Sequence, residues 1–277
     1  MSQGPLLADE AARHVARQYD AFQTGLERIG KERKYLNYGY AAPGCRRYED
    51  RQAELCRRVF ELAGVAPGHR VVDVGFGSGE QDLLFAREAR FARLDAFNIS
   101  AEQVRYANDQ ARRAGLGELL HFHRGPAEDM AVLGDASVDR VLAVECAFYF
   151  DRPRFYREAH RVLAPGGRLA LADIAFDGRL GERLARRPGL ERVGTFAANR
   201  RAWEGCFETL EVRDIRRAVR PGAQQTVGRC LGSLRYRPPR SELVHWLSMA
   251  AYTQLVVLGL WTGVLRYDLI LLEKPAR

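Results

Sequence analysis

The 277-residue chain has few cysteines, and their pattern argues against two kinds of stabilised fold. The five cysteines are scattered, odd in number and never spaced as Cys-x-x-Cys. This pattern disfavours a disulfide framework and the common zinc motifs, and it suits the reducing cytoplasm, where we expect the protein to work. No cluster of His, Asp and Glu indicates a metal, so we predict none and disfavour a metal-dependent mechanism.

Long hydrophobic runs are also lacking. The N-terminus has no basic stretch followed by an apolar core, so we predict no signal peptide. The most apolar segment, residues 247–265, contains Ser248, Thr253 and Gln254, and its uninterrupted apolar part is too short for a bilayer span. We expect a buried helix that leads towards a core strand, and peripheral contact with a membrane stays open.

Lysine is nearly absent, and the arginines that replace it are concentrated in one segment. Residues 178–240 hold 15 arginines, no lysine and six acids, a balance of +9, although the whole chain carries only +8. Two interpretations stay open: a solvated basic face, and side chains that hold a phosphate or another anionic group of a ligand. The candidates for the second are Arg186, Arg187, Arg200, Arg201, Arg216 and Arg217.

The chain is not uniform in its expected secondary structure. Residues 1–64 read as helices joined by an aromatic loop at residues 35–40. In residues 65–175 short apolar runs alternate with helical patterns, which predicts a mainly parallel sheet with helices on both faces. The strands of this region are expected at residues 70–74, 93–97, 119–123, 138–144 and 168–173.

The alternation stops in the C-terminal third. We expect residues 176–263 to form a helical, arginine-rich cap, with one further core strand near residues 211–219. Residues 264–277 then supply the final core strand. Apolar residues of the cap suggest that it covers an apolar ligand, and they are Trp203, Phe207, Leu243, Trp246, Met249, Tyr252 and Leu255.

A glycine-rich turn follows the first expected strand. Gly75, Gly77 and Gly79 would let the backbone approach a ligand closely, and the helix that follows offers free N–H groups to an anionic group. Nicotinamide and flavin enzymes use related turns, and a tight strand–helix connection would look similar. Three details favour S-adenosylmethionine (SAM): Asp73 within the strand end, the Gly-x-Gly-x-Gly spacing, and about 70 residues before the turn.

Four segments resemble, in order, those of the class I SAM-dependent methyltransferases. Residues 71–79 are similar to the first motif of that family, and residues 96–103 to the end of its second strand. Residues 124–130 resemble the adenine loop, and residues 145–173 resemble the stretch after the fourth strand. The resemblance covers residues 70–175 and is closest to small-molecule enzymes of the sterol, tocopherol, quinone and natural-product type. It implies an α/β, Rossmann-like fold with a mainly parallel seven-stranded sheet.

The resemblance also implies how SAM would be held. Glycines border the methionine part, with Asp73 near the amino group and an aromatic side chain as a lid, while Asn98 lies by the ribose. The implied cofactor residues are Tyr38, Tyr40, Asp73, Gly75, Gly77, Gly79, Asn98, Ser100, Gln103, Ala127 and Glu128. Ser100 and Gln103 have a second interpretation, that of a helix cap alone. Asn98 and Pro126 depart from the family, which usually has carboxylates there.

Methyl transfer requires an acceptor in line with the methyl group and a base for any proton that the acceptor carries. Glu145 is our candidate base, with Tyr149 as its hydrogen-bonding partner; alternatively, Glu145 orients SAM. His245 could reach the substrate, although an ordinary structural histidine is the other interpretation.

These observations predict C- or O-methylation of a small, largely apolar acceptor, such as an isoprenoid, a polyketide or a lipid, with or without an anionic head. The alternatives are a cyclase or another non-methylating protein of the same fold and, with less support, a nucleic-acid methyltransferase. We expect no nucleic-acid partner, and a homodimer stays open.

Overall fold

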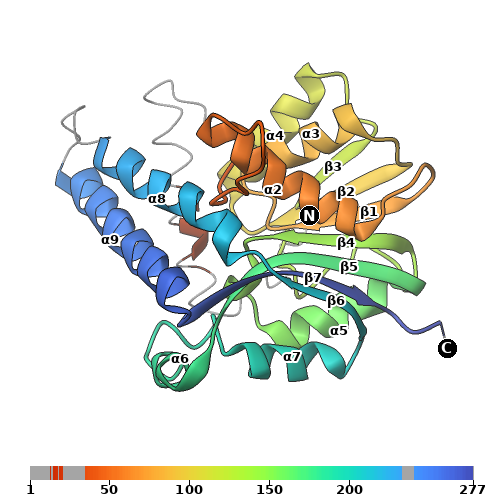
Figure 1. Cartoon of the computed structure of the whole chain (residues 1–277). Coiled ribbons are helices and arrows are strands. Elements are labelled where there is room, and N and C mark those ends of the chain that lie inside the picture. Colours follow the sequence, from red (N-terminus) through yellow and green to blue (C-terminus); the bar gives the residue numbers. More distant parts are fainter. Residues whose placement is uncertain (1–12, 14, 18, 21–34, 233–239, 277) are drawn as a thin grey trace.

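The computed structural model describes residues 13, 15–17, 19, 20, 35–232 and 240–276, and a seven-stranded sheet forms its centre (Figure 1). The strand order is β3-β2-β1-β4-β5-β7-β6, and only β7 runs antiparallel to its neighbours. The predicted Rossmann-like fold with a mainly parallel sheet is therefore confirmed. The strands are β1 (Arg70–Val74), β2 (Arg93–Asn98), β3 (Leu120–Arg124), β4 (Val138–Val144), β5 (Leu163–Phe176), β6 (Glu208–Asp214) and β7 (Leu265–Glu273).

Helices cover both faces of the sheet, because the central strands are apolar on both sides. Four consecutive residues of β1 and the last four of β4 are buried, which is typical of strands within a parallel sheet. On one face lie α2 (Tyr48–Ala63), α3 (Glu80–Glu88) and α4 (Ala101–Arg113). On the other face lie α5 (Arg152–Val162) and α7 (Phe196–Glu204) (Figure 1).

The segment expected to be one cap, residues 176–263, is divided between three places. After α6 (Gly178–Leu184), α7 packs beside α5, and β6 joins the sheet edge earlier than the strand expected near residues 211–219. The part of this segment that lies beyond the end of β5 consists of α8 (Arg216–Gly232) and α9 (Arg240–Thr262), which pack against each other (Figure 1). The side chain of Trp203 explains the difference, because it is fully buried with its ring 6.1 Å from that of Tyr156 on α5.

A helix and a strand form in residues 247–265 as predicted, but the helix is not buried as expected, since Leu255, Leu258 and Trp261 are exposed. Helix α9 ends at Thr262, and Gly263, with a φ of 80°, turns the chain into β7. None of the helices in the described part of the chain has the length and hydrophobicity of a membrane span.

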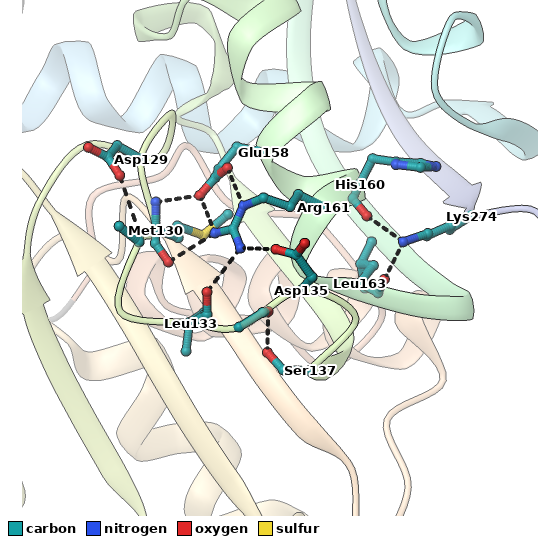
Figure 2. A network of polar contacts seen from close by, with 12 residues as sticks. Asp129, Met130, Leu133, Asp135, Ser137, Glu158, His160, Arg161, Leu163 and Lys274 are labelled. Atoms are coloured by element: carbon teal, nitrogen blue, oxygen red, sulfur yellow. Dashed lines mark hydrogen bonds and ion pairs between the residues drawn. The ribbon is translucent and has the colours of Figure 1, made fainter.

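Strand β5 begins earlier than the sequence predicts. It was expected to begin at residue 168, but the backbone of Lys274 pairs with Gly166 and Gly167 and joins residues 163–167 to the sheet, with Gly166 at a φ of 74°. The Lys274 ammonium also donates to the carbonyl groups of His160 and Leu163, at 2.8 and 2.7 Å (Figure 2). The C-terminal end of α5 is thereby stabilised by a cation that lies 111 residues or more away in the chain.

Candidate active site

The glycine turn after β1 forms one wall of a deep pocket. Gly75, Gly77 and Gly79 have φ angles of 70°, 60° and 80°, which glycine adopts without strain. A Cβ at Gly75 would lie 2.6 Å from that of Cys146, and one at Gly77 would lie 3.2 Å from Leu36. Side chains at these positions would therefore push the end of β4 and the segment before α2 away from the turn.

The pocket contains about 900 Å³ of empty space, including the part that opens to solvent. Eight of the residues predicted from the sequence line it, and they are Gly75, Gly77, Asn98, Gln103, Ala127, Glu128, Glu145 and Tyr149. Four separate loops at the carboxyl ends of β1, β2, β3 and β4 thus meet at one site, as expected for a parallel sheet.

The other five predicted cofactor residues do not line this pocket, and they are Tyr38, Tyr40, Asp73, Gly79 and Ser100. Tyr40 lies under the Arg58 guanidinium, 5.3 Å from its ring centre. Gly79 lets the turn pack on α4, where a Cβ would lie 2.7 Å from that of Ala107.

Asp73 does not line the pocket but contacts Gln81, which does. Its carboxylate is fully buried, and one oxygen accepts a hydrogen bond from the Gln81 side chain at 2.5 Å. Gln81 itself lines the pocket, so Asp73 fixes the orientation of that amide. Burial raises the pKa of Asp73 to about 7, and it raises the pKa of the neighbouring Asp82 as well.

Asn98 and Gln103 form a pair of amides at the end of β2. The Asn98 amide donates to the Gln103 side-chain oxygen at 2.9 Å and to the Gly77 carbonyl at 3.4 Å. This pairing leaves the buried Gln103 amide nitrogen without a partner among the described residues. A buried donor that lines a pocket is costly unless a ligand or water satisfies it.

Ser100 has the helix-cap geometry. Its hydroxyl accepts from the Gln103 backbone at 3.2 Å and donates to the Asp20 carboxylate at 2.6 Å. The side chain therefore caps α4 and holds a residue of the N-terminal segment, and it does not line the pocket.

The loop that contains Ala127 and Glu128 is fixed by hydrogen bonds on the side away from the pocket. A Glu128 oxygen accepts from the Asp151 backbone at 2.7 Å. On the far side, Arg161 pairs with Glu158 at 2.7 Å and donates to the Met130 carbonyl, while Glu158 accepts from the Met130 N–H (Figure 2). These bonds attach the loop after β3 to α5, so its position depends on the helix on the opposite face.

Glu145 lies where the pocket opens into a second cavity, and it lines both. It follows the last residue of β4 with a φ of 56°, a conformation that is unfavourable for a residue with a Cβ. One carboxylate oxygen accepts from the Tyr38 backbone at 2.7 Å. Burial raises the pKa of Glu145 to about 8, well above its ordinary value.

The second cavity contains about 1790 Å³ of empty space, including the part that opens to solvent. It lies between α2, α8 and α9, so these three helices form the cap that the sequence predicts only in part. Phenols dominate its wall, contributed by Tyr19, Tyr35, Tyr38, Tyr48, Tyr149 and Tyr252. The Tyr19 hydroxyl donates to that of Tyr149 at 3.1 Å, and burial raises the pKa of Tyr19 to about 12.

Several residues singled out in the sequence lie elsewhere. His245 belongs to α9, but its side chain is outside the part that the structure describes. Trp203 and Phe207 are buried on the α5 face and do not line the second cavity, whereas Met249 and Tyr252 do. Arg216, one of the six candidate arginines, pairs with Asp214, and none of the six lines either cavity.

Other lining residues were not predicted. Gln81 lies in the first turn of α3, two residues after Gly79. Its contact with Asp73 could be seen only in the structure. Thr226 and Arg229 line the second cavity from α8, far in sequence from the aromatic loop. No local pattern marks such residues, because they come together only through packing of α8 on α2.

Comparison with known proteins agrees with this geometry. A sequence model of the methyltransferase domain matches residues 72–171. An O-methyltransferase of Penicillium expansum is 30% identical over 186 residues, which cover 64% of this chain and 67% of that protein. The chain belongs to the class I SAM-dependent methyltransferases. SAM, the predicted cofactor, is the methyl donor of this family.

Two further relatives of the methyltransferase act on named natural products. Erythromycin 3''-O-methyltransferase of Saccharopolyspora erythraea is 38% identical over 52% of this chain and 47% of that protein. The 27-O-demethylrifamycin SV methyltransferase of Amycolatopsis mediterranei is 34% identical over 58% of each chain. The match thus spans about half the length of these relatives.

Solved structures share the fold of the methyltransferase. The [4+2]-cyclase SpnF has a TM-score of 0.79 at 22% identity and covers 98% of this chain and 99% of its own. Geranyl diphosphate C-methyltransferase of Streptomyces coelicolor has a TM-score of 0.72 at 16% identity, covering 96% and 99%. At these identities the likeness extends to the fold alone.

Proposed function

We propose that the protein transfers the methyl group of SAM to a hydroxyl oxygen of a small natural-product acceptor, with Glu145 as the general base. The position of Glu145 carries the proposal, because this largely buried carboxyl group is shared by the two cavities. One cavity has the family's glycine turn, and the other is large and lined by phenols. The curated relatives with named O-methylation reactions support oxygen as the acceptor atom.

The residues of the first pocket fit SAM. Gly75 and Gly77 leave room for the methionine part, and the free amide nitrogen of Gln103 would donate to a ribose hydroxyl. Ala127 and Glu128 would border the adenine. Asp73 would act through Gln81, which it orients towards the methionine end. When bound, SAM supplies a methyl group activated by a sulfonium charge.

Glu145 would take the proton that the acceptor hydroxyl loses as its oxygen bonds to the methyl carbon. The Tyr38 N–H fixes one carboxylate oxygen, and the buried Tyr267 hydroxyl lies close to the same carboxyl group, so both contacts would orient it towards the acceptor. A carboxyl group with a pKa of about 8 is a stronger base than an ordinary glutamate, and a nearby positive charge would favour its ionised form. The phenol pair of Tyr19 and Tyr149 would exclude water from this point.

The test uses SAM with an isotopically labelled methyl group and hydroxyl-bearing macrocycles, 27-O-demethylrifamycin SV among them. We expect a labelled methyl ether in the mass spectrum. Glu145→Gln should lower kcat by roughly 100-fold or more while SAM affinity changes little. The kcat of the wild type should fall as the pH drops below the pKa of Glu145 in the complex, and the variant should lose this dependence.

Full activity of Glu145→Gln would rule out its role as base. A labelled product methylated on carbon would replace O-methylation by C-methylation. A rearranged acceptor that carries no label would indicate a cyclase, the reaction named for SpnF.

The proposal also covers the cellular compartment and the partners of the protein. The described cysteines are free thiols, which suits the cytoplasm. The acceptor is a small molecule, and the proposal includes no nucleic acid; a homodimer and membrane contact are not needed for the chemistry.

A further inference from the structure

The second cavity has two walls of different chemistry. Near Glu145 the wall is formed by phenols and apolar side chains, including Phe148 and Ile174. Helices α2 and α8 contribute Gln52 and four further polar residues, which we call the polar rim: Tyr48, Glu49, Thr226 and Arg229. None of these four residues hydrogen-bonds or pairs with Glu145 in the described part of the chain, so the rim would contact another part of the acceptor.

Contacts between the helices organise the polar rim. Arg229 pairs with Glu49 at 2.9 Å and lies 4.9 Å from the centre of the Tyr48 ring. The Tyr48 hydroxyl is 2.7 Å from that of Thr226, which is buried and also donates to the Gly222 carbonyl. The rim is therefore a connected set of donors and acceptors, built from residues up to 181 positions apart.

The described residues of the cavity wall carry no excess of positive charge for a diphosphate. Among the described residues, the formally charged side chains that line it are Glu49, Glu145 and Arg229. The Arg229 charge is balanced by Glu49, so a phosphate group at the rim would meet a carboxylate as closely as a guanidinium. The other polar groups there are hydroxyls, which both donate and accept hydrogen bonds.

We propose that the polar rim is a subsite for a neutral, polyhydroxylated part of the acceptor, and not for a phosphate. Glu49 would accept hydrogen bonds from acceptor hydroxyls, and Arg229 would donate to their oxygens, while Tyr48 and Thr226 would complete the set. This proposal rests on the proposed function, since it assigns the second cavity to the acceptor. It replaces the anionic head group that the arginine-rich segment suggested.

The experiment is isothermal titration of the full chain saturated with S-adenosylhomocysteine, so that binding is measured without turnover. The probes are erythromycin, its sugar-free macrolide ring and geranyl diphosphate. Erythromycin should bind at least about 10-fold more tightly than geranyl diphosphate. Glu49→Gln and Thr226→Val should each weaken erythromycin binding by roughly 3- to 10-fold.

Glu54→Gln is the matched control, because Glu54 lies on the same helix and pairs with Arg58. It should leave erythromycin binding unchanged. If the sugar-free ring binds as tightly as erythromycin, and the rim variants weaken both ligands equally, the subsite binds hydroxyls of the ring. If the sugar-free ring binds more weakly than erythromycin, the subsite binds the sugars. Both results support a polyhydroxyl subsite.

Three results would overturn the inference: tighter binding of geranyl diphosphate, binding of none of the probes, or rim variants that bind erythromycin like the wild type. These results are independent of turnover. Failure of methyl transfer with intact, rim-dependent binding would overturn only the proposed function.

Discussion

At the scale of single residues, Glu145 combines two features that oppose stability. Its carboxyl group is largely withdrawn from water but partly accessible, and its backbone has a positive φ of 56°. A residue held in this way is typical of functional sites, where the surrounding structure compensates for the strain. Stability and the proposed chemistry are therefore in conflict at this position.

We predict that Glu145→Gln is more stable than the wild type at high pH. The pKa of Glu145 is about 8 in the folded protein against an ordinary 4.5, so the folded state favours the protonated form. The contribution of Glu145 is most favourable below 4.5 and is lost as the pH rises through 8. The gain of the variant should be small near pH 5 and reach on the order of 5 kcal/mol above about pH 9.

Urea unfolding of both proteins at several pH values checks this prediction. A stability difference that does not change with pH would show that Glu145 is ionised equally easily in the folded and unfolded states.

Ser100 and Gln103 separate the two roles that the sequence left open. Ser100→Ala should destabilise the fold by about 1 kcal/mol, as loss of a helix cap does, with SAM affinity nearly unchanged. Gln103→Leu should weaken SAM binding by roughly 10-fold, because it removes the free amide donor in the pocket. Thermal unfolding and SAM titration of both variants test the assignment, and the reverse pattern would exchange the two roles.

At the scale of elements, the contact of α8 with the segment before α2 controls both cavities. Gly222 of α8 lies so close to the Tyr38 carbonyl that a Cβ would be 1.7 Å from its oxygen. The same residue, Tyr38, donates its N–H to Glu145. A shift of α8 would therefore displace Tyr38 and, through the Tyr38 N–H, the side chain of Glu145.

Gly222→Ala should therefore destabilise the protein by roughly 2 kcal/mol or more and lower kcat, because α8 or the loop must shift. Gly228→Ala, in the same helix, is the matched control, since a Cβ there meets no atom within 4 Å. It should be neutral or stabilise the protein by about 0.5–1 kcal/mol. Chemical unfolding and kcat measurements test the pair, and equal effects would refute the close contact.

At the scale of the whole molecule, the sheet was predictable and the acceptor cavity was not. The strands from β1 to β5 and the glycine turn follow from apolar runs and spacing that lie within a few residues. The cap was expected as one unit because helical, arginine-rich sequence continues through residues 176–263, and only the burial of Trp203 beside Tyr156 shows that α7 lies with α5 on the other face of the sheet. Likewise, Thr226 meets Tyr48 across 178 positions, a distance at which sequence patterns carry no information.

The most direct measurement of the central claim is a crystal structure with S-adenosylhomocysteine. The account predicts that the ligand's sulfur points towards Glu145 and the second cavity, with the ribose beside Gln103 and the adenine beside Ala127. A ligand bound outside this pocket, or one whose sulfur faces away from Glu145, would contradict it.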